Sequence, residues 1–176
     1  MEARDLTPYK VGMIEENIER TGLLNIEAVC QDALVYDEGS REKADIVIAD
    51  LPCSGLGCFS EKKTDLKYKA TKQGAAELAQ MQREMLDVVC RYVKSGGKLL
   101  YSTCTVNPAE NEENVRWFLE THPEFELADL RECMKQWKPE ACEELLQAVS
   151  EEGWLQLLPG IHKSDGFFIA GLRKRK

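Results

Sequence analysis

Short apolar runs alternate along this chain with longer segments whose apolar residues recur at helical spacing, and this alternation constrains the fold most strongly. Strands are expected at 25–30, 44–49, 98–102, 154–159 and 166–172, and helices at about 8–21, 75–93, from 107 onward and over 131–150. The triplet Ser95-Gly96-Gly97 is expected to end the second helix before its strand. The pattern predicts one α/β domain over 1–176, with a mostly parallel sheet covered by helices on both faces.

Composition excludes several classes of protein. The chain has 176 residues, of which 43% are hydrophobic and 31% charged, as in ordinary globular domains. No run approaches the roughly 18 apolar residues of a membrane helix, and the first residues lack the form of a signal peptide. Seven cysteines, an odd number spread through the chain, suit reduced thiols. We therefore expect a cytoplasmic protein with no membrane partner.

Two cysteines follow predicted strands directly. Cys53 lies in Asp50-Leu51-Pro52-Cys53-Ser54-Gly55, and Cys104 lies in Tyr101-Ser102-Thr103-Cys104-Thr105. The carboxyl ends of parallel strands form the edge at which such sheets bind ligands. The pKa of a thiol placed there, ahead of a helix start such as Asn107-Pro108-Ala109-Glu110, can be lowered, and the resulting thiolate is a nucleophile. In contrast, Cys30 and Cys90 lie within apolar runs and are expected to be core residues.

Zinc binding is the main alternative use for Cys53, Cys58 and Cys104. The chain has no Cys-x-x-Cys pair, which also argues against a thioredoxin-like redox role, and His122 and His162 stand alone. We predict no metal site.

Charge is distributed unevenly along the chain. The net charge of −8 argues against attraction of the whole surface to nucleic acid. Lysines crowd the stretch after the first cysteine motif, where Lys63 and Lys67 are candidates for phosphate contacts, and Arg173-Lys174-Arg175-Lys176 ends the chain. A solvated loop and a solubilising tail are the simpler interpretations of the two basic segments.

The two cysteine motifs resemble, in order and spacing, the paired motifs of RNA cytosine-5 methyltransferases of the Nop/Sun type, and most closely the branch that acts on bacterial small-subunit ribosomal RNA. The resemblance extends almost from end to end. It is carried further by Gln82-Arg83-Glu84-Met85-Leu86, Ser95-Gly96-Gly97-Lys98-Leu99-Leu100, Pro108-Ala109-Glu110-Asn111-Glu112 and Asp165-Gly166-Phe167-Phe168-Ile169-Ala170.

The resemblance implies a Rossmann-like S-adenosylmethionine-dependent methyltransferase fold, and it assigns roles to residues. By position in the family pattern, Cys104 is the nucleophile that adds to carbon 6 of cytosine, because carbon 5 does not accept a methyl group unaided. Asp50 is then the residue that hydrogen-bonds the ring near N3, and Cys53 assists loss of the carbon 5 proton. Asp5 and Asp32 match cofactor-binding acids near the ribose and adenine, and Asp50 lies beside the methionine end.

The chain also departs from the family pattern. The family's glycine-rich motif, its first strand and most of its second strand are expected before Arg4, so the resemblance implies a domain truncated at its amino end. Such a chain is expected to have unpaired sheet edges, which can favour dimerisation, and weak or no methyl transfer alone.

Two alternatives to a cytosine-5 methyltransferase remain open. One is a noncatalytic RNA-binding or assembly fragment, which would bind RNA in a salt-dependent way without methyl transfer. The other is methylation of an exocyclic amine, which needs no cysteine pair and would survive replacement of Cys104 by serine.

Overall fold

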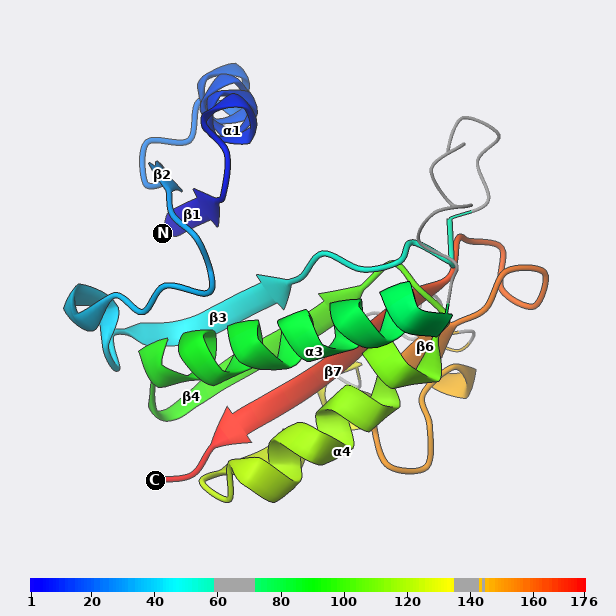
Figure 1. Cartoon of the computed structure of the whole chain (residues 1–176). Helices are drawn as coiled ribbons and strands as arrows, with labels where there is room; N and C mark the ends of the chain where they lie inside the picture. Colours follow the sequence, from blue (N-terminus) through cyan, green and yellow to red (C-terminus); the bar gives the residue numbers. More distant parts are fainter. Residues whose placement is uncertain (59–71, 135–142, 144) are drawn as a thin grey trace. The chain divides into compact units, whose positions relative to one another are not determined.

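The computed structural model describes residues 1–58, 72–134, 143 and 145–176, and it divides into two compact units, 1–39 and 40–176 (Figure 1). Each unit is described by itself. Of the helix expected over 131–150, residues 135–142 and 144 lie outside the described residues; its described beginning is α5 (Leu130–Met134). Within these described ranges no helix is both long and apolar enough to cross a membrane.

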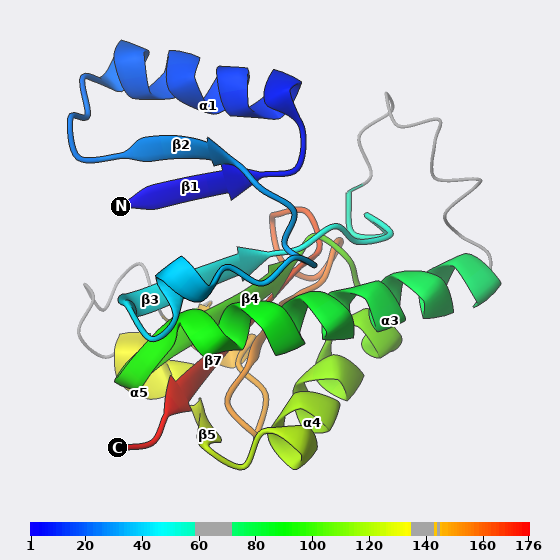
Figure 2. The ribbon, with the colours of Figure 1, turned by 60° about the vertical axis from the view of Figure 1, so that its left-hand side comes forward.

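The first unit is a strand–helix–strand arrangement, with α1 alongside the strand pair in Figure 2. Strands β1 (Glu2–Asp5) and β2 (Glu27–Cys30) are parallel, joined through α1 (Pro8–Thr21). Thr7 accepts a hydrogen bond from the Lys10 backbone N–H at 3.4 Å and starts α1. The helix expected at 8–21 is confirmed.

The second unit is built on a five-stranded sheet of order β3-β4-β7-β5, with β6 paired to β7. Its strands are β3 (Ala44–Asp50), β4 (Val93–Thr103), β5 (Phe125–Ala128), β6 (Leu155–Leu157) and β7 (Phe167–Lys174). The pairing of β3 with β4 is parallel, whereas β7 is antiparallel to its three neighbours β4, β5 and β6. Strands β3, β4, β5 and β6 therefore run in one direction and β7 alone runs against them, so the mostly parallel sheet expected from the sequence is confirmed, with β7 reversed.

Helices α3 (Lys72–Val89) and α4 (Glu112–Thr121) pack on one face of this sheet (Figure 1). Alternate residues of β4 point toward them, and Leu99, Tyr101 and Thr103 are all completely buried. A smaller cluster occupies the other face: Leu130, Met134, Val149 and Leu155.

Two boundaries differ from the sequence-based expectation. Helix α3 ends at Val89 and is followed by the 3-10 turn η2 (Cys90–Tyr92), so the Ser95-Gly96-Gly97 triplet lies inside β4 rather than ahead of it. Gly96 has a φ of 78°, and the pairing of β3 with β4 is irregular at this point. The glycines thus allow a bulge in a strand instead of ending a helix.

Several short elements were not expected. Asn107 caps only a 3-10 turn, η3 (Pro108–Glu110), and Asn111 precedes α4. Strand β5 has four residues, too few for a clear alternating pattern, and its pairing with β7 defines it. A further 3-10 turn, η1 (Glu38–Ser40), precedes β3.

Strand β3 pairs with β4, and among the described residues no strand pairs with its other edge. Ile46 and Ile48 are 62% and 65% exposed on the face opposite α3. An unpaired edge with exposed apolar residues is a known route to association. Dimerisation through such edges stays a prediction.

Candidate active site

The two motif cysteines meet at the carboxyl ends of β3 and β4. Parallel pairing sets Asp50 opposite Ser102, so the loop after β3 and the loop after β4 leave the sheet side by side. The Leu51 N–H donates to the Ser102 carbonyl at 3.3 Å, which continues the pairing into the loops. As a result the Sγ atoms of Cys53 and Cys104, both half-buried, lie 3.3 Å apart. At this separation one thiol can donate a hydrogen bond to the other sulfur.

Asp50 lies at the same edge of the sheet. Its side chain is exposed, and its Oδ1 accepts a hydrogen bond from the Ser102 hydroxyl at 2.9 Å. This contact leaves the second carboxylate oxygen available to a ligand, because an ionised carboxylate has several acceptor positions. The structure therefore brings together three of the predicted site residues: Asp50, Cys53 and Cys104.

The loop after β3 turns sharply to return toward β4. Gly55 has a φ of 69°, which confirms the unusual backbone angle expected there. The Gly57 N–H then donates to the Cys104 carbonyl at 3.1 Å, and the Cys58 thiol lies 3.9 Å from the same oxygen. Among the described residues, no group of three or more Cys, His, Asp or Glu side chains is arranged to hold a metal ion.

Gly57 and Gly166 bring the first cysteine loop against the start of β7. The Gly166 N–H donates to the Gly57 carbonyl at 2.8 Å. A Cβ at Gly57 would lie 2.8 Å from the Gly166 Cα, and a Cβ at Gly166 would lie 2.6 Å from the Val106 Cγ1. Both positions therefore require glycine for close backbone approach, which the sequence did not reveal for Gly57.

The predicted cofactor residues Asp5 and Asp32 belong to the first unit. Asp5 ends β1 opposite Cys30, and Asp32 follows β2, so both carboxylates lie at the carboxyl ends of neighbouring parallel strands. Asp5 accepts from the Thr7 N–H at 3.3 Å and Asp32 accepts from the Leu34 N–H at 2.9 Å. Cys30, expected in the core, is exposed, because β2 is a short strand at the edge of this unit.

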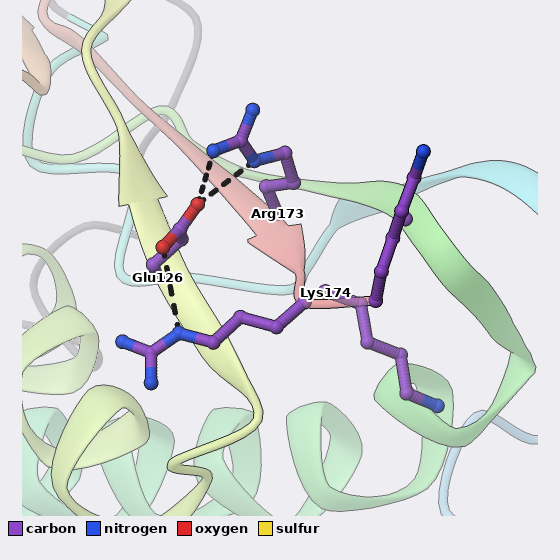
Figure 3. Close-up of a pocket in the computed structure, with 6 residues that line it drawn as sticks. Glu126, Arg173 and Lys174 are labelled. Atoms are coloured by element: carbon purple, nitrogen blue, oxygen red, sulfur yellow. Dashed lines mark hydrogen bonds and ion pairs between the residues drawn. The ribbon is translucent and has the colours of Figure 1, made fainter.

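The basic tail at the end of the chain is not part of the cysteine site. Lys63 and Lys67 lie outside the described residues. The tail lines a cavity of about 330 Å³ with Gly96 and Glu126, at the end of β7 far from Thr103. Figure 3 shows Glu126 accepting hydrogen bonds from Arg173, and the Arg175 guanidinium lies 3.4 Å from the same carboxylate. Lys174 pairs with Glu42 at 2.9 Å, so neighbouring acids offset much of this positive charge.

A buried polar cluster behind the cysteines was missed at the sequence level. Gln82, Glu110, Asn111 and Asn114 are completely buried, and their side chains bond one another or the cysteine loops. Burial also raises the pKa of Tyr101, whose neutral hydroxyl donates to the Gln82 side chain at 3.2 Å. Gln82, Glu110 and Asn111 lie in motifs that carry the family resemblance, but those motifs did not indicate that these side chains contact one another.

Comparison with known proteins places this arrangement in a family. The profile described as 16S rRNA methyltransferase RsmB/F matches residues 1–173. The chain is 38% identical over 172 residues to the probable ribosomal RNA small subunit methyltransferase B of Bacillus subtilis, covering 97% of the chain and 37% of that protein. It is 35% identical over 173 residues to the ribosomal RNA small subunit methyltransferase F of Escherichia coli, covering 98% and 34%. The chain thus spans about a third of the length of these relatives.

Solved structures agree with this placement. NSun6 from Pyrococcus horikoshii, solved with SFG, has a TM-score of 0.74 and 27% identity, over 99% of this chain and 41% of that one. A methyltransferase homologue from the same organism has a TM-score of 0.73 and 29% identity, over 98% and 52%. The Rossmann-like methyltransferase fold class expected from the sequence is confirmed. With these matches and the paired cysteines, the chain belongs to the 16S rRNA methyltransferase RsmB/F family.

Proposed function

We propose that this chain carries the reacting groups of an enzyme that transfers a methyl group from S-adenosylmethionine to carbon 5 of a cytosine in small-subunit ribosomal RNA. The observation that carries the proposal is the 3.3 Å separation of the Cys53 and Cys104 Sγ atoms at the edge that also holds Asp50. The relatives named as ribosomal RNA methyltransferases support methyl transfer to RNA. Carbon 5 as the target rests on the chemistry of the cysteine pair.

The first step assigned to the chain is addition of Cys104. Its thiolate forms a bond to carbon 6 of the cytosine, and the electron pair of the 5,6 double bond moves toward carbon 5 and the N3 side of the ring. A hydrogen bond from the Cys53 thiol, 3.3 Å away, stabilises the Cys104 thiolate before attack. Asp50, held by Ser102, shares a proton with N3 and so stabilises the adduct.

Release reverses the addition. When bound, S-adenosylmethionine would supply an electrophilic methyl group for carbon 5, and its sulfur would leave as the thioether of S-adenosylhomocysteine. Once the Cys104 sulfur is bonded to carbon 6, Cys53 gives up its thiol proton to solvent, and the carbon 5 proton then passes to the Cys53 thiolate. The 5,6 double bond reforms, and the Cys104–carbon 6 bond breaks to return the Cys104 thiolate. The two cysteines therefore need to approach the same face of the ring, and their adjacent sulfurs fit that requirement.

Asp5 and Asp32 fit the cofactor. Each offers carboxylate oxygens at the carboxyl end of a parallel strand, where the hydroxyl and amino groups of a nucleoside can donate to them. We propose that Asp5 binds the ribose hydroxyls and Asp32 lies near the adenine, with Asp50 at the methionine end. The NSun6 structure contains SFG, an analogue of S-adenosylmethionine, which supports a cofactor site of this kind.

The proposal is tested by nucleoside mass spectrometry of unmodified small-subunit ribosomal RNA after incubation with S-adenosylmethionine. Two proteins are assayed, each beside its Cys104→Ser variant. One is this chain alone. The other is the Escherichia coli relative with its matched residues replaced by this chain, because the chain spans 34% of that protein. Melting curves followed by circular dichroism control for folding of every protein.

We expect 5-methylcytosine from the Escherichia coli relative that carries this chain, and none from its Cys104→Ser variant. An N-methylated base that persists in Cys104→Ser would overturn the cysteine mechanism in favour of exocyclic amine transfer. RNA binding that weakens with salt, without methylation by either folded protein, would favour the noncatalytic alternative, with Lys63 and Lys67 as candidate phosphate contacts. A cytoplasmic location follows from the proposed ribosomal RNA substrate and stays part of the proposal.

A further inference from the structure

Glu110 is an acidic residue buried between the two cysteine loops. It is 0% exposed, and it ends the 3-10 turn η3 six residues after Cys104. Its Oε2 accepts from the Ser54 backbone N–H at 2.8 Å, and its Oε1 accepts from the Asn107 side-chain amide at 2.9 Å. Ser54 directly follows Cys53, so a single carboxylate joins the loop of one cysteine to the loop of the other.

Gln82 supports this link from helix α3. Its amide donates to Glu110 Oε2 at 3.1 Å and to the Pro52 carbonyl at 2.9 Å, and its oxygen accepts from Asn114 at 2.9 Å. The residues before and after Cys53 are therefore both fixed, one by Gln82 and one by Glu110. A second tie joins the loops directly, because the Ser54 and Thr105 hydroxyls lie 2.8 Å apart.

The three groups that face the Glu110 side chain are all donors: a backbone N–H and two side-chain amides. Only a group that accepts at both ends satisfies them. An amide at this position would turn an NH₂ toward Ser54 and Gln82 or toward Asn107. The Asn107 side chain cannot simply flip to accept it, since its oxygen already accepts from the Ala109 N–H at 3.3 Å.

We propose that Glu110 is a positioning residue: its carboxylate holds the loops of Cys53 and Cys104 so that the two sulfurs meet. The catalytic consequence rests on the proposed function, because only a covalent mechanism needs the sulfurs together. The geometric consequence does not rest on it. Loss of the carboxylate therefore separates the sulfurs whatever reaction the protein performs.

The test follows disulfide formation between Cys53 and Cys104 in the chain itself, which needs neither RNA nor cofactor. Hydrogen peroxide oxidises the two thiols to one disulfide, and the peroxide is reduced to two waters. Peptide mass spectrometry reports the rate of the Cys53–Cys104 link. Iodoacetamide alkylation of each cysteine separately, in Cys53→Ala and Cys104→Ala backgrounds, reports whether the individual thiols remain equally accessible.

We expect Glu110→Gln to slow the disulfide by about tenfold or more, since displacement of reacting atoms by about 1 Å has large effects on rate. The alkylation rate of each single cysteine should change by less than about twofold, whereas a general loosening of the site would change that rate by more. Glu113→Gln, which removes an exposed carboxylate three residues away, is the matched control and should leave the disulfide rate unchanged.

A rescue variant keeps the test independent of general stability. Asn107→Asp alone places two carboxylates together and should also slow the disulfide. The double variant Asn107→Asp with Glu110→Gln restores a donor opposite an acceptor, and should recover the rate to within about threefold of the parent, as expected for coupled neighbours. If Glu110→Gln keeps the parent's rate, or the double variant stays as slow as Glu110→Gln, the positioning role is wrong.

The same variants separate this inference from the proposed function. In the replaced Escherichia coli relative, Glu110→Gln should lower kcat for 5-methylcytosine formation about tenfold with little change in KM for RNA, because positioning acts on the reacting atoms. A slowed disulfide without any methyl transfer by the parent would retain the positioning role and overturn the reaction. An unchanged rate of disulfide formation in Glu110→Gln, together with methyl transfer by the parent, would retain the proposed reaction and overturn the positioning role.

Discussion

The Sγ atoms of Cys53 and Cys104 lie 3.3 Å apart although the two residues are 51 positions apart in the sequence. The pairing of Asp50 with Ser102 in neighbouring parallel strands sets this proximity, and the hydrogen bonds between the following loops maintain it. The site is therefore a property of two loops held in register. Changes that move either loop should affect the cysteines before they affect the sheet.

Replacing Gly57 or Gly166 by alanine should move the first cysteine loop. A Cβ at either position lies within 2.8 Å of a neighbouring atom, so the backbones must separate. We expect each variant to lose about 1–3 kcal/mol of unfolding free energy, measured by urea denaturation. Gly12→Ala is the control: nothing lies within 4 Å of its Cβ position. Because this position is helical, the substitution should be neutral or stabilising by up to about 1 kcal/mol. Equal effects at all three glycines would contradict the role of the close approach.

Cys90 should be the slowest described cysteine to alkylate in the folded protein. It is 3% exposed, and burial raises the pKa of its thiol to about 12. Because the thiolate is the reactive form, iodoacetamide at pH 8 should label Cys90 ~100-fold or more slowly than the exposed Cys30 and Cys133. The difference should vanish in guanidinium, and fast labelling of Cys90 before unfolding would contradict its burial.

The raised pKa of Cys90 also predicts how stability depends on pH. The unfolded chain loses the thiol proton near its ordinary pKa of about 9, whereas the folded chain holds it to about 12. The unfolded state thus binds fewer protons between these values, and this contribution to the unfolding free energy should fall as pH rises through that window. Cys90→Ala should remove this part of the decrease in unfolding free energy at alkaline pH. Denaturation curves at pH 8 and pH 10.5 measure the difference, and identical pH dependence in both proteins would contradict the prediction.

Asp5 and Asp32 are expected to bind S-adenosylmethionine. Hydrogen bonds to charged groups contribute enough that Asp5→Asn or Asp32→Asn should raise Kd about tenfold. Isothermal titration calorimetry on this chain, and on the Escherichia coli relative that carries it, measures the effect. Glu27→Gln is the control, since this exposed residue begins β2 at the opposite end of the strand from Asp32. Unchanged affinity in both aspartate variants would remove these residues from the cofactor site.

Local sequence patterns predicted much of this fold. The first helix was predicted from a capping threonine, a first-turn proline and a terminal glycine, and α1 has those boundaries. Cys53 and Cys104 were placed after strands because both follow apolar runs, and both positions are confirmed. The reversed direction of β7 was not predictable in this way, because it follows from the pairing of β7 with β4, β5 and β6.

The contacts within the site were harder to predict for the same reason. Glu110 looked like part of a helix cap, yet its partners include Ser54, 56 positions away, and Gln82, 28 positions away. Gly57 has no local signature, since only Gly166 makes a side chain impossible there. Sequence motifs thus indicated the candidate reacting residues, whereas tertiary pairing determines which residues hold them in place.

The most direct test of the covalent mechanism is to trap the RNA on Cys104. The Escherichia coli relative carrying this chain with Cys53→Ala is incubated with small-subunit ribosomal RNA and S-adenosylmethionine, then separated on a denaturing gel, with peptide mass spectrometry of the retained complex. Without Cys53 the carbon 5 proton leaves slowly, so a complex bonded through Cys104 should accumulate, and Cys53→Ala combined with Cys104→Ser should give none. A complex in which the RNA is bonded through another residue would contradict the account. So would methylation without any complex in Cys53→Ala, combined with full activity in Cys104→Ser.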